Sequence, residues 1–432
     1  MHSPELLANV RLSPAAFTRN RKLPFPTVLT LLLAGLTRSV QAELDRLFGT
    51  LDDSPHSRPK VSAQAFSKAR KGISAKVFHR LNQSLLGLVE THLKVPRWRG
   101  FRVVAADASK LQLFLQDTTG RKVREAIAFM LYLPGLELAL DFELYSPLVG
   151  ERQMLFEHLE SLRADDLLVL DRGYPALWLI AALLQRGIHF CLRVDATGFA
   201  EVRRFLRSGQ AEAVVTLTAP PARDAADYDV PRQPSTVRLI RGVTPNGRVH
   251  VVMTSLRDPI AYPAADFAAL YHARWRIEEA FKRIKHRLAL EQLSGLSWLA
   301  ALQDFGANVL CDNLNALAVY AAAPEPVARP GGQPSQLYKI NRSYAFGALK
   351  SRFQHWLTGA LPALADLAEV LGQILKNLVA WHPGASKPHP ERPKPRRSTG
   401  NGAQRSGVRR PPRTQDERGP PKAINSSPIF CS

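Results

Sequence analysis

The sequence contains few cysteines and no long apolar run. Its 432 residues include three cysteines, Cys191, Cys311 and Cys431, which are too widely spaced for a disulfide framework or a zinc site. No uninterrupted apolar stretch reaches the roughly 18 residues that span a bilayer. We therefore expect no disulfide-rich secreted domain and no membrane span, and we expect a reducing, cytoplasmic compartment.

Acidic residues are also scarce relative to basic ones. Lys and Arg number 58 against 37 Asp and Glu, which gives a net charge of +21 and a pI of about 10.3. Residues 383–432 hold ten of the 32 prolines and a net charge of +8, so the remainder keeps +13. We predict that this tail is disordered. Because the excess persists without the tail, the folded part is itself expected to face a polyanion, either nucleic acid or an anionic membrane surface.

The first 97 residues have helical character. Apolar spacing predicts helices within 26–48 and a pair of helices between 61 and 93, with Ser62 as an N-cap and Gly72 at the break. The pair carries several basic side chains, including Lys68, Arg70 and Lys71. These residues fit a helix–turn–helix DNA reader or, equally, a solvated basic face.

From residue 98 the pattern predicts an α/β domain with the order β-β-β-α-β-α-β, which fits a mixed sheet with helices on its faces. The first strand is predicted to end at Asp107 and the fourth at Asp171. Residues 196–263 predict antiparallel strands inserted into this domain, and helices return over 264–382. The predicted units are therefore 1–97, 98–195, 196–263, 264–382 and the tail.

Two aspartates at strand ends suggest a metal site. In an open α/β sheet the carboxyl ends of the strands face the functional crevice, and the first and fourth strands are commonly adjacent. Side-by-side carboxylates repel each other unless a cation lies between them. Mg²⁺ or Mn²⁺ would suit all-oxygen ligands. The alternative is that both acids are turn residues.

A helix after the predicted insertion presents four polar side chains on one face. Tyr271, Arg274, Glu278 and Lys285 stand at offsets of 0, 3, 7 and 14. At about 100° per residue they fall within a stripe about 60° wide. A solvated charged face would look similar. Glu279 is a rival acid, but it lies about 100° from the stripe.

The residues resemble the signature of bacterial insertion-sequence DDE transposases of the IS-four type. The segment YHARWRIEEAFKRIK matches Y-x2-R-x3-E-x6-K at every spacing, DAS at Asp107 resembles D-G-[ST] with Ala108 replacing the glycine, and DRGY at Asp171 is similar to the second-aspartate motif. The resemblance covers about residues 15–380.

This resemblance implies an RNase H-like catalytic fold and a nucleoid-associated protein that cuts at transposon ends and transfers the strands into target DNA. Asp107, Asp171 and Glu278 would be the catalytic triad and would hold two Mg²⁺ or Mn²⁺ ions. The N-terminal helices would bind the terminal inverted repeats, and two protomers would pair two ends. Tyr271, Arg274 and Lys285 would contact the DNA phosphates beside the cleaved bond. Arg238 and Arg241 in the predicted insertion are plausible phosphate contacts, although exposed strand arginines are common. The basic residues Lys68, Arg70 and Lys71 complete the candidate DNA-binding set.

Other functions remain open at this point. The chain could be a catalytically inactive or domesticated DNA-binding relative, which Ala108 beside the first aspartate would favour. It could also be a metal-dependent nuclease on the same fold. An RNA- or ribosome-associated basic protein would leave the acids at the strand ends without a purpose.

Overall fold

The protein is represented by a computed structural model, which describes residues 1–18, 22–35, 39–51, 61–116, 121–243, 247–286, 291–323, 327–328, 337–358 and 364–381. Residues 1–382 form one compact unit. The tail that the sequence predicts to be disordered lies outside the described residues. No described helix is both long enough and apolar enough to cross a membrane.

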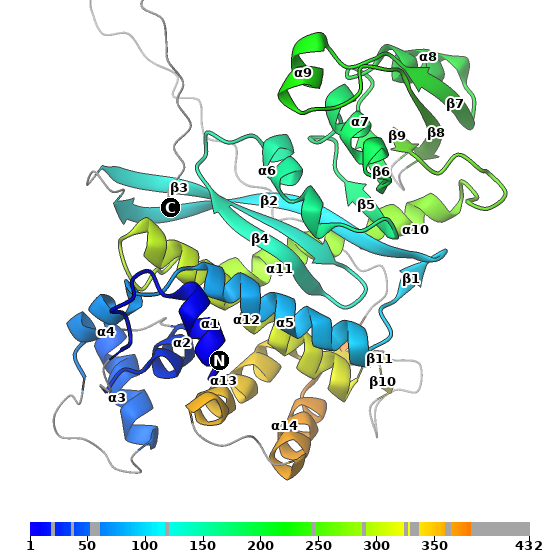
Figure 1. Ribbon diagram of the computed structural model, residues 1–432. Helices are drawn as coiled ribbons and strands as arrows, with labels where there is room; N and C mark the ends of the chain where they lie inside the picture. Colours follow the sequence, from blue (N-terminus) through cyan, green and yellow to red (C-terminus); the bar gives the residue numbers. More distant parts are fainter. Residues whose placement is uncertain are drawn as a thin grey trace, which may run out of the picture. The chain divides into compact units, whose positions relative to one another are not determined.

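A nine-stranded mixed sheet forms the centre of the protein (Figure 1). Its main path runs in the order β4-β3-β2-β5-β6-β9-β8-β7, and β1 pairs with β2. The strands are β1 (Arg97–Trp98), β2 (Phe101–Gln116), β3 (Lys122–Leu133), β4 (Leu138–Tyr145), β5 (Asp166–Leu170), β6 (His189–Val194), β7 (Glu212–Leu217), β8 (Ser235–Val243) and β9 (Val249–Thr254).

The first five long strands have the order of an RNase H-like fold. β2, β3 and β4 form an antiparallel meander, and β5 and β6 are parallel to β2. β5 is buried along its whole length, as its continuous apolar sequence predicts for a central strand. The predicted fold class is confirmed, as is the adjacency of the first and fourth strands of this core.

The strands predicted as an insertion extend the same sheet. β9 pairs antiparallel with β6, β8 pairs with β9, and β7 forms the far edge. The region also contains two helices that the sequence did not predict, α8 (Ala200–Ser208) and α9 (Ala222–Asp227). Joining the core sheet satisfies the backbone groups of β6, which would otherwise be an open edge.

Helices cover both faces of the core sheet. Alternate residues of β2 point to opposite sides: Ala105 belongs to the apolar cluster that contains Ile277 of α11, and Ala106 belongs to the cluster that contains Met154 of α6. The helices of this region are α6 (Glu151–Glu157), α7 (Leu177–Gln185), α10 (Asp266–Ala273), α11 (Trp275–His286) and α12 (Trp298–Ala322), with a short 3-10 turn at Leu159–Ser161.

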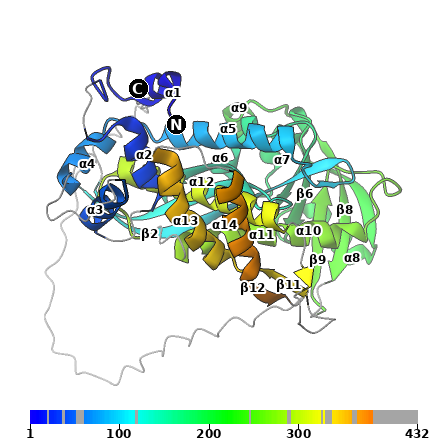
Figure 2. The same cartoon turned by 90° about the horizontal axis from the view of Figure 1, so that it is seen from below.

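The N-terminal helices pack beside the core through α12 (Figure 2). They are α1 (Pro4–Val10), α2 (Phe25–Leu33), α3 (Val40–Leu51), α4 (Ala63–Arg70) and α5 (Lys76–His92). Ser62 caps α4 as predicted, by accepting a hydrogen bond from the Ala65 N–H. Gly306 of α12 lies so close to α5 that a Cβ there would be 2.7 Å from the Cβ of Phe78.

A small sheet follows α12 where the sequence predicts helices alone. β10 (Val327–Ala328), β11 (Leu337–Ile340) and β12 (Leu378–Trp381) are antiparallel neighbours in that order. α13 (Arg342–Thr358) and α14 (Leu364–Lys376) lie between the last two strands in sequence. Residues of both helices share an apolar cluster with the end of α12.

Candidate active site

The register of β2 and β5 places Asp107 and Asp171 opposite each other. The last parallel pair is Ala105 with Val169, and each aspartate follows two residues later. Both therefore have the parity of the residues that face α10 and α11. Because β5 ends at Leu170, the two carboxylates lie at the carboxyl edge of the parallel pair, where an open α/β sheet has its crevice.

Asp107 itself does not end its strand, and this expectation was wrong. β2 continues to Gln116 because β3 goes on pairing with it as far as Lys122, although β5 has ended. The Ala108 N–H donates to the Oδ1 atom of Asp107 at 3.0 Å. Asp107 thus lies within a strand that pairs with β3 on one side and has passed its last pair with β5 on the other.

The helix stripe meets both aspartates. The Tyr271 hydroxyl donates to Asp171 Oδ1 at 2.9 Å. The Arg274 guanidinium contacts Glu278 at 2.6 Å and Asp107 at 3.5 Å. Arg274 stands where α10 gives way to α11, and it is only 6 % exposed. We call Asp107, Asp171, Glu278, Tyr271 and Arg274 the acidic site.

The fourth member of the stripe lies further along β2. Lys285 donates from Nζ to the carbonyl oxygen of Lys110, and burial lowers the pKa of Lys285. All four side chains of the stripe therefore face the sheet. Glu279, the rival acid, points away and lies 3.9 Å from Arg276, with a half-exposed side chain.

The two aspartates differ in electrostatic environment. Burial, with smaller contributions from Glu278 and Glu151, raises the pKa of Asp107 to about 6, although Arg274 and the Ala108 N–H oppose the shift. Burial also acts to raise the pKa of Asp171. However, hydrogen bonds from the Arg172 backbone N–H and the Tyr271 hydroxyl, together with the charge of Arg274, lower the pKa of Asp171 below its ordinary value. The hydrogen bond and positive charge beside Asp107 therefore do not offset its burial, whereas those beside Asp171 do.

The cation between the carboxylates is an arginine. Neighbouring carboxylates repel each other unless a cation lies between them, and the guanidinium of Arg274 is such a cation for Asp107 and Glu278, both of which it contacts. Among the described residues, no three His, Cys, Asp or Glu side chains are arranged to hold a metal ion. The oxygen donors nonetheless suit Mg²⁺ or Mn²⁺. The Nε atom of Arg274 is buried without a partner, so this arginine has hydrogen-bonding capacity to spare.

The comparisons with known proteins identify the family of the chain. The family described as "Transposase DDE domain" matches residues 98–314, half of the chain. The chain belongs to the DDE transposase family. It is similar to the transposase InsG for insertion sequence element IS4 of Escherichia coli (strain K12). The two are 24% identical over 311 residues, which cover 67% of this chain and 68% of that protein. The resemblance to the IS-four type is thereby confirmed.

A solved structure is similar at a lower level. The piggyBac transposase in a cryo-EM synaptic complex with hairpin DNA gives a TM-score of 0.42 at 12% identity, over 90% of this chain and 86% of that chain. A score this low does not establish a common fold. The RNase H-like assignment rests on the strand order of the protein itself.

Two arginines predicted to contact DNA in this DDE transposase chain are structural, and those expectations were wrong. Arg70 is 4 % exposed and bonds to Gln303, Asp304 and the Ala300 carbonyl oxygen. Arg238 is 1 % exposed, pairs with Glu212 and donates to the Tyr262 carbonyl oxygen at 2.7 Å. Both guanidiniums are directed into the protein because an acid from a distant part of the chain lies beside each of them.

Arg241 is also used by the fold. Its guanidinium donates to the carbonyl oxygens of Phe205, Leu206 and Gln210. Phe205 and Leu206 lie in the last turn of α8, whose carbonyl groups have no partner within the helix. Arg241 is half-buried and its contacts define it first as a cap for α8.

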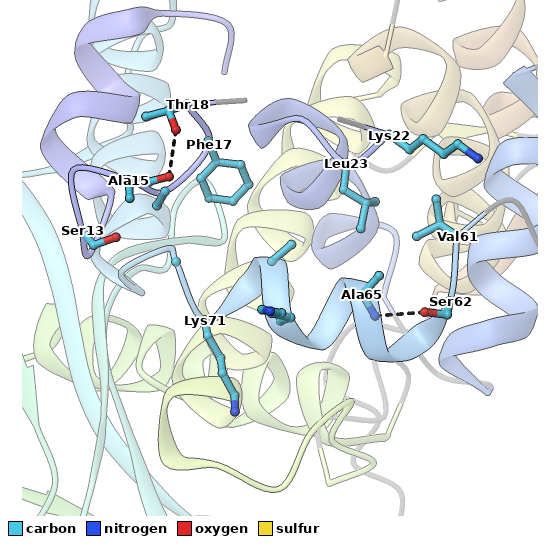
Figure 3. Close-up of a pocket in the computed structure, with 14 residues that line it drawn as sticks. Ser13, Ala15, Phe17, Thr18, Lys22, Leu23, Val61, Ser62, Ala65 and Lys71 are labelled. Carbon is cyan, nitrogen blue, oxygen red and sulfur yellow. Dashed lines mark hydrogen bonds between the residues drawn. The ribbon is translucent and has the colours of Figure 1, made fainter. Parts of the chain in front are cut away.

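Lys68 and Lys71 are exposed, and they line a groove in the N-terminal region (Figure 3). The groove has a volume of about 890 Å³ and lies between the segment after α1 and helix α4. Its floor is largely apolar, and Lys22 and Lys71 stand at opposite ends of it (Figure 3). Lys68 and Lys71 are thus the members of the predicted N-terminal set that can reach a partner.

Sequence reasoning missed one residue beside the acidic site, Glu151. Glu151 Oε2 lies where a Cβ on Gly173 would be 3.1 Å from it. Gly173, in the DRGY motif, does not have a φ in the left-handed region. A side chain at 173 would crowd Glu151. The available signal was the helical pattern that begins at Glu151 in the sequence, because a helix that starts there places an acid at the same sheet edge as Asp171.

Proposed function

We propose that this protein is a DNA transposase that cleaves DNA at the ends of its element and joins the freed 3′ ends to target DNA. The observation that carries the proposal is the acidic site. Asp107 of β2 and Asp171, which directly follows β5, each lie two residues beyond the last pair of these adjacent parallel strands, and Arg274 links Glu278 of α11 to Asp107. The substrate is double-stranded DNA, and we further propose that two protomers pair two ends.

The carboxylates of Asp107, Asp171 and Glu278 would hold two Mg²⁺ or Mn²⁺ ions. Such ions supply Lewis-acid activation of the attacking hydroxyl and stabilise the leaving oxygen of an in-line phosphoryl transfer. The resident cation, Arg274, contacts Asp107 only at 3.5 Å. A DNA phosphate would give its guanidinium a new anionic partner and free Asp107 to bind an ion.

The polar stripe would orient the DNA strand. Tyr271 and Arg274 lie next to the acids, and Lys285 lies further along β2, beside Lys110. Each offers donors to phosphate oxygens, which position DNA without reading its sequence. A strand bound along this stripe would run parallel to β2, with its scissile phosphate over Asp107.

The test is an assay of purified protein with Mg²⁺ and a labelled duplex that carries the element's end. Wild type is expected to nick the end and join it to a target duplex. Asp107→Asn, Asp171→Asn and Glu278→Gln should each lower the rate by about a thousandfold, since metal-ion stabilisation provides several kcal/mol.

Glu279→Gln is the matched control, because it changes the neighbouring acid that points away from the site. It should retain the wild-type rate. Wild-type activity in the Asp107→Asn variant would refute the catalytic proposal. Nicking without joining would instead identify a nuclease.

A further inference from the structure

Glu151 is a fourth carboxylate at the edge of the acidic site. It is the first residue of α6, directly after Gly150. The neighbouring Arg152 donates from Nε to the Gly173 carbonyl oxygen at 3.0 Å, which holds the first turn of α6 against the loop that follows Asp171. The carboxylate of Glu151 lies against the same glycine.

Glu151 and Glu278 approach this edge from opposite sides of the sheet. The apolar residues of α6 belong to the core cluster on one face, and those of α11 belong to the cluster on the other. The carboxylates also affect one another: burial and then Asp171 raise the pKa of Glu151, and Glu151 contributes to raising that of Asp107. Among the described basic residues none forms an ion pair with Glu151 within 4 Å.

A buried hydroxyl is directed at the same place. Tyr174 is 1 % exposed, and its hydroxyl has no hydrogen-bond partner. Its charged surroundings are Asp107, Glu151, Arg274 and Asp171. Buried polar groups are almost always paired, so an unpaired hydroxyl among four charged groups is available to donate to a ligand atom.

We propose that Glu151 completes the divalent-ion site together with Asp107 and Asp171, and that the Tyr174 hydroxyl donates to an oxygen of the bound ligand. This inference rests on the proposed function and adds a residue to its site. Mg²⁺ and Mn²⁺ accept one or two carboxylates each besides their other oxygen ligands. The divalent-ion site would then be supplied with a carboxylate from each face of the sheet, Glu278 on one side and Glu151 on the other.

The test measures Mn²⁺ binding to the full-length protein without DNA, from the loss of the free Mn²⁺ signal in electron paramagnetic resonance. Glu151→Gln should bind one ion about tenfold more weakly or lose it, and Glu151→Asp should recover part of the affinity. Glu160→Gln is the matched control, because this nearby glutamate has a side chain that is 90% exposed. It should bind Mn²⁺ as wild type does.

Thermal unfolding separates this role from a structural one. Without metal, Glu151→Gln should melt at or above the wild-type temperature, because it removes a carboxylate whose pKa is raised in the folded state. With Mn²⁺, wild type should gain more than the variant. Tyr174→Phe should retain the metal-free melting temperature and lose DNA-cleavage rate.

Several outcomes would overturn the inference. These are wild-type Mn²⁺ affinity in Glu151→Gln, no measurable binding in wild type, or a lower metal-free melting temperature in Glu151→Gln. If Glu151→Gln binds Mn²⁺ as wild type does, and wild type cleaves DNA normally, the transposase proposal stands and the ion-site inference fails. Weakened binding in the variant, with no cleavage by wild type, would support the ion site and refute the proposed function.

Discussion

Replacing Asp107 by Asn should make the metal-free protein more stable while it abolishes catalysis. The side chain of Asp107 is only 20% exposed, and its pKa is about 6 in place of an ordinary 3.8. Asn keeps the Oδ1 atom that accepts the Ala108 N–H. Arg274 is not left alone by the change, because it still contacts Glu278 at 2.6 Å.

The size of the effect follows from the two pKa values. Their difference corresponds to about 3 kcal/mol of unfolding free energy. Below the unfolded-state pKa the carboxyl is protonated in both states and costs nothing. As pH rises from about 4 to about 6, the folded state retains a proton that the unfolded state has lost, so wild-type stability falls. Asp107→Asn should therefore gain almost nothing near about pH 3 and about 3 kcal/mol near about pH 8.

Urea unfolding in EDTA, followed by circular dichroism at several pH values, would measure this. Asp165→Asn is the matched control. Hydrogen bonding and charge from Arg97 lower the pKa of Asp165, so its loss should not stabilise the protein at any pH. If Asp107→Asn is less stable than wild type near pH 8, or its gain is independent of pH, the charge on Asp107 is not the cost that the structure indicates.

Three further predictions concern other parts of the protein. Arg102→Met should lose about 3–5 kcal/mol in urea unfolding, because it leaves the fully buried Asp166 without its bidentate partner; a loss under 1 kcal/mol would contradict this. Burial acts to raise the pKa of Asp141, but hydrogen bonds from two histidines and a serine lower it far below its ordinary value. Wild-type stability should therefore fall as pH drops below about 4, and Asp141→Asn should make that fall smaller. Lys71→Gln should weaken binding to end DNA and lower the salt slope by about one, measured by fluorescence anisotropy. The exposed control Lys94→Gln should change neither, and equal losses in both variants would argue against a specific contact.

Local periodicity accounted for the part of the site that lies on one helix. The spacing of Tyr271, Arg274, Glu278 and Lys285 put them on one face, and all four face the sheet. Strand order could also be predicted, because a three-stranded meander followed by crossover helices leaves few arrangements. That order was enough to bring two aspartates together that are 64 residues apart in sequence.

Long-range partners could not be predicted. The sequence alone favours a surface position for Arg70 and Arg238, because arginine is rarely buried without a partner. The partners exist, but Asp304 lies 234 residues from Arg70, and Glu212 lies on the strand next to Arg238. The length of β2 was also missed, although its second half alternates buried and exposed side chains as a strand does. Pairing with β3 holds that half as a strand after β5 has ended.

The length of β2 bears on the distance between the DNA end that the protein would bind and the bond that it would cut. From Asp107 to Gln116 the strand extends about 30 Å, close to the roughly 34 Å of one duplex turn. At its far end the Gln116 N–H bonds to the Leu296 carbonyl oxygen, and Ser294 nearby is held by Arg70 of α4. Strand β2 thus connects the helices proposed to bind the element's end with the aspartate proposed to cut it. Deleting one residue from β2 would do more than shorten this connection, because it would turn every later side chain of the strand to the other face of the sheet.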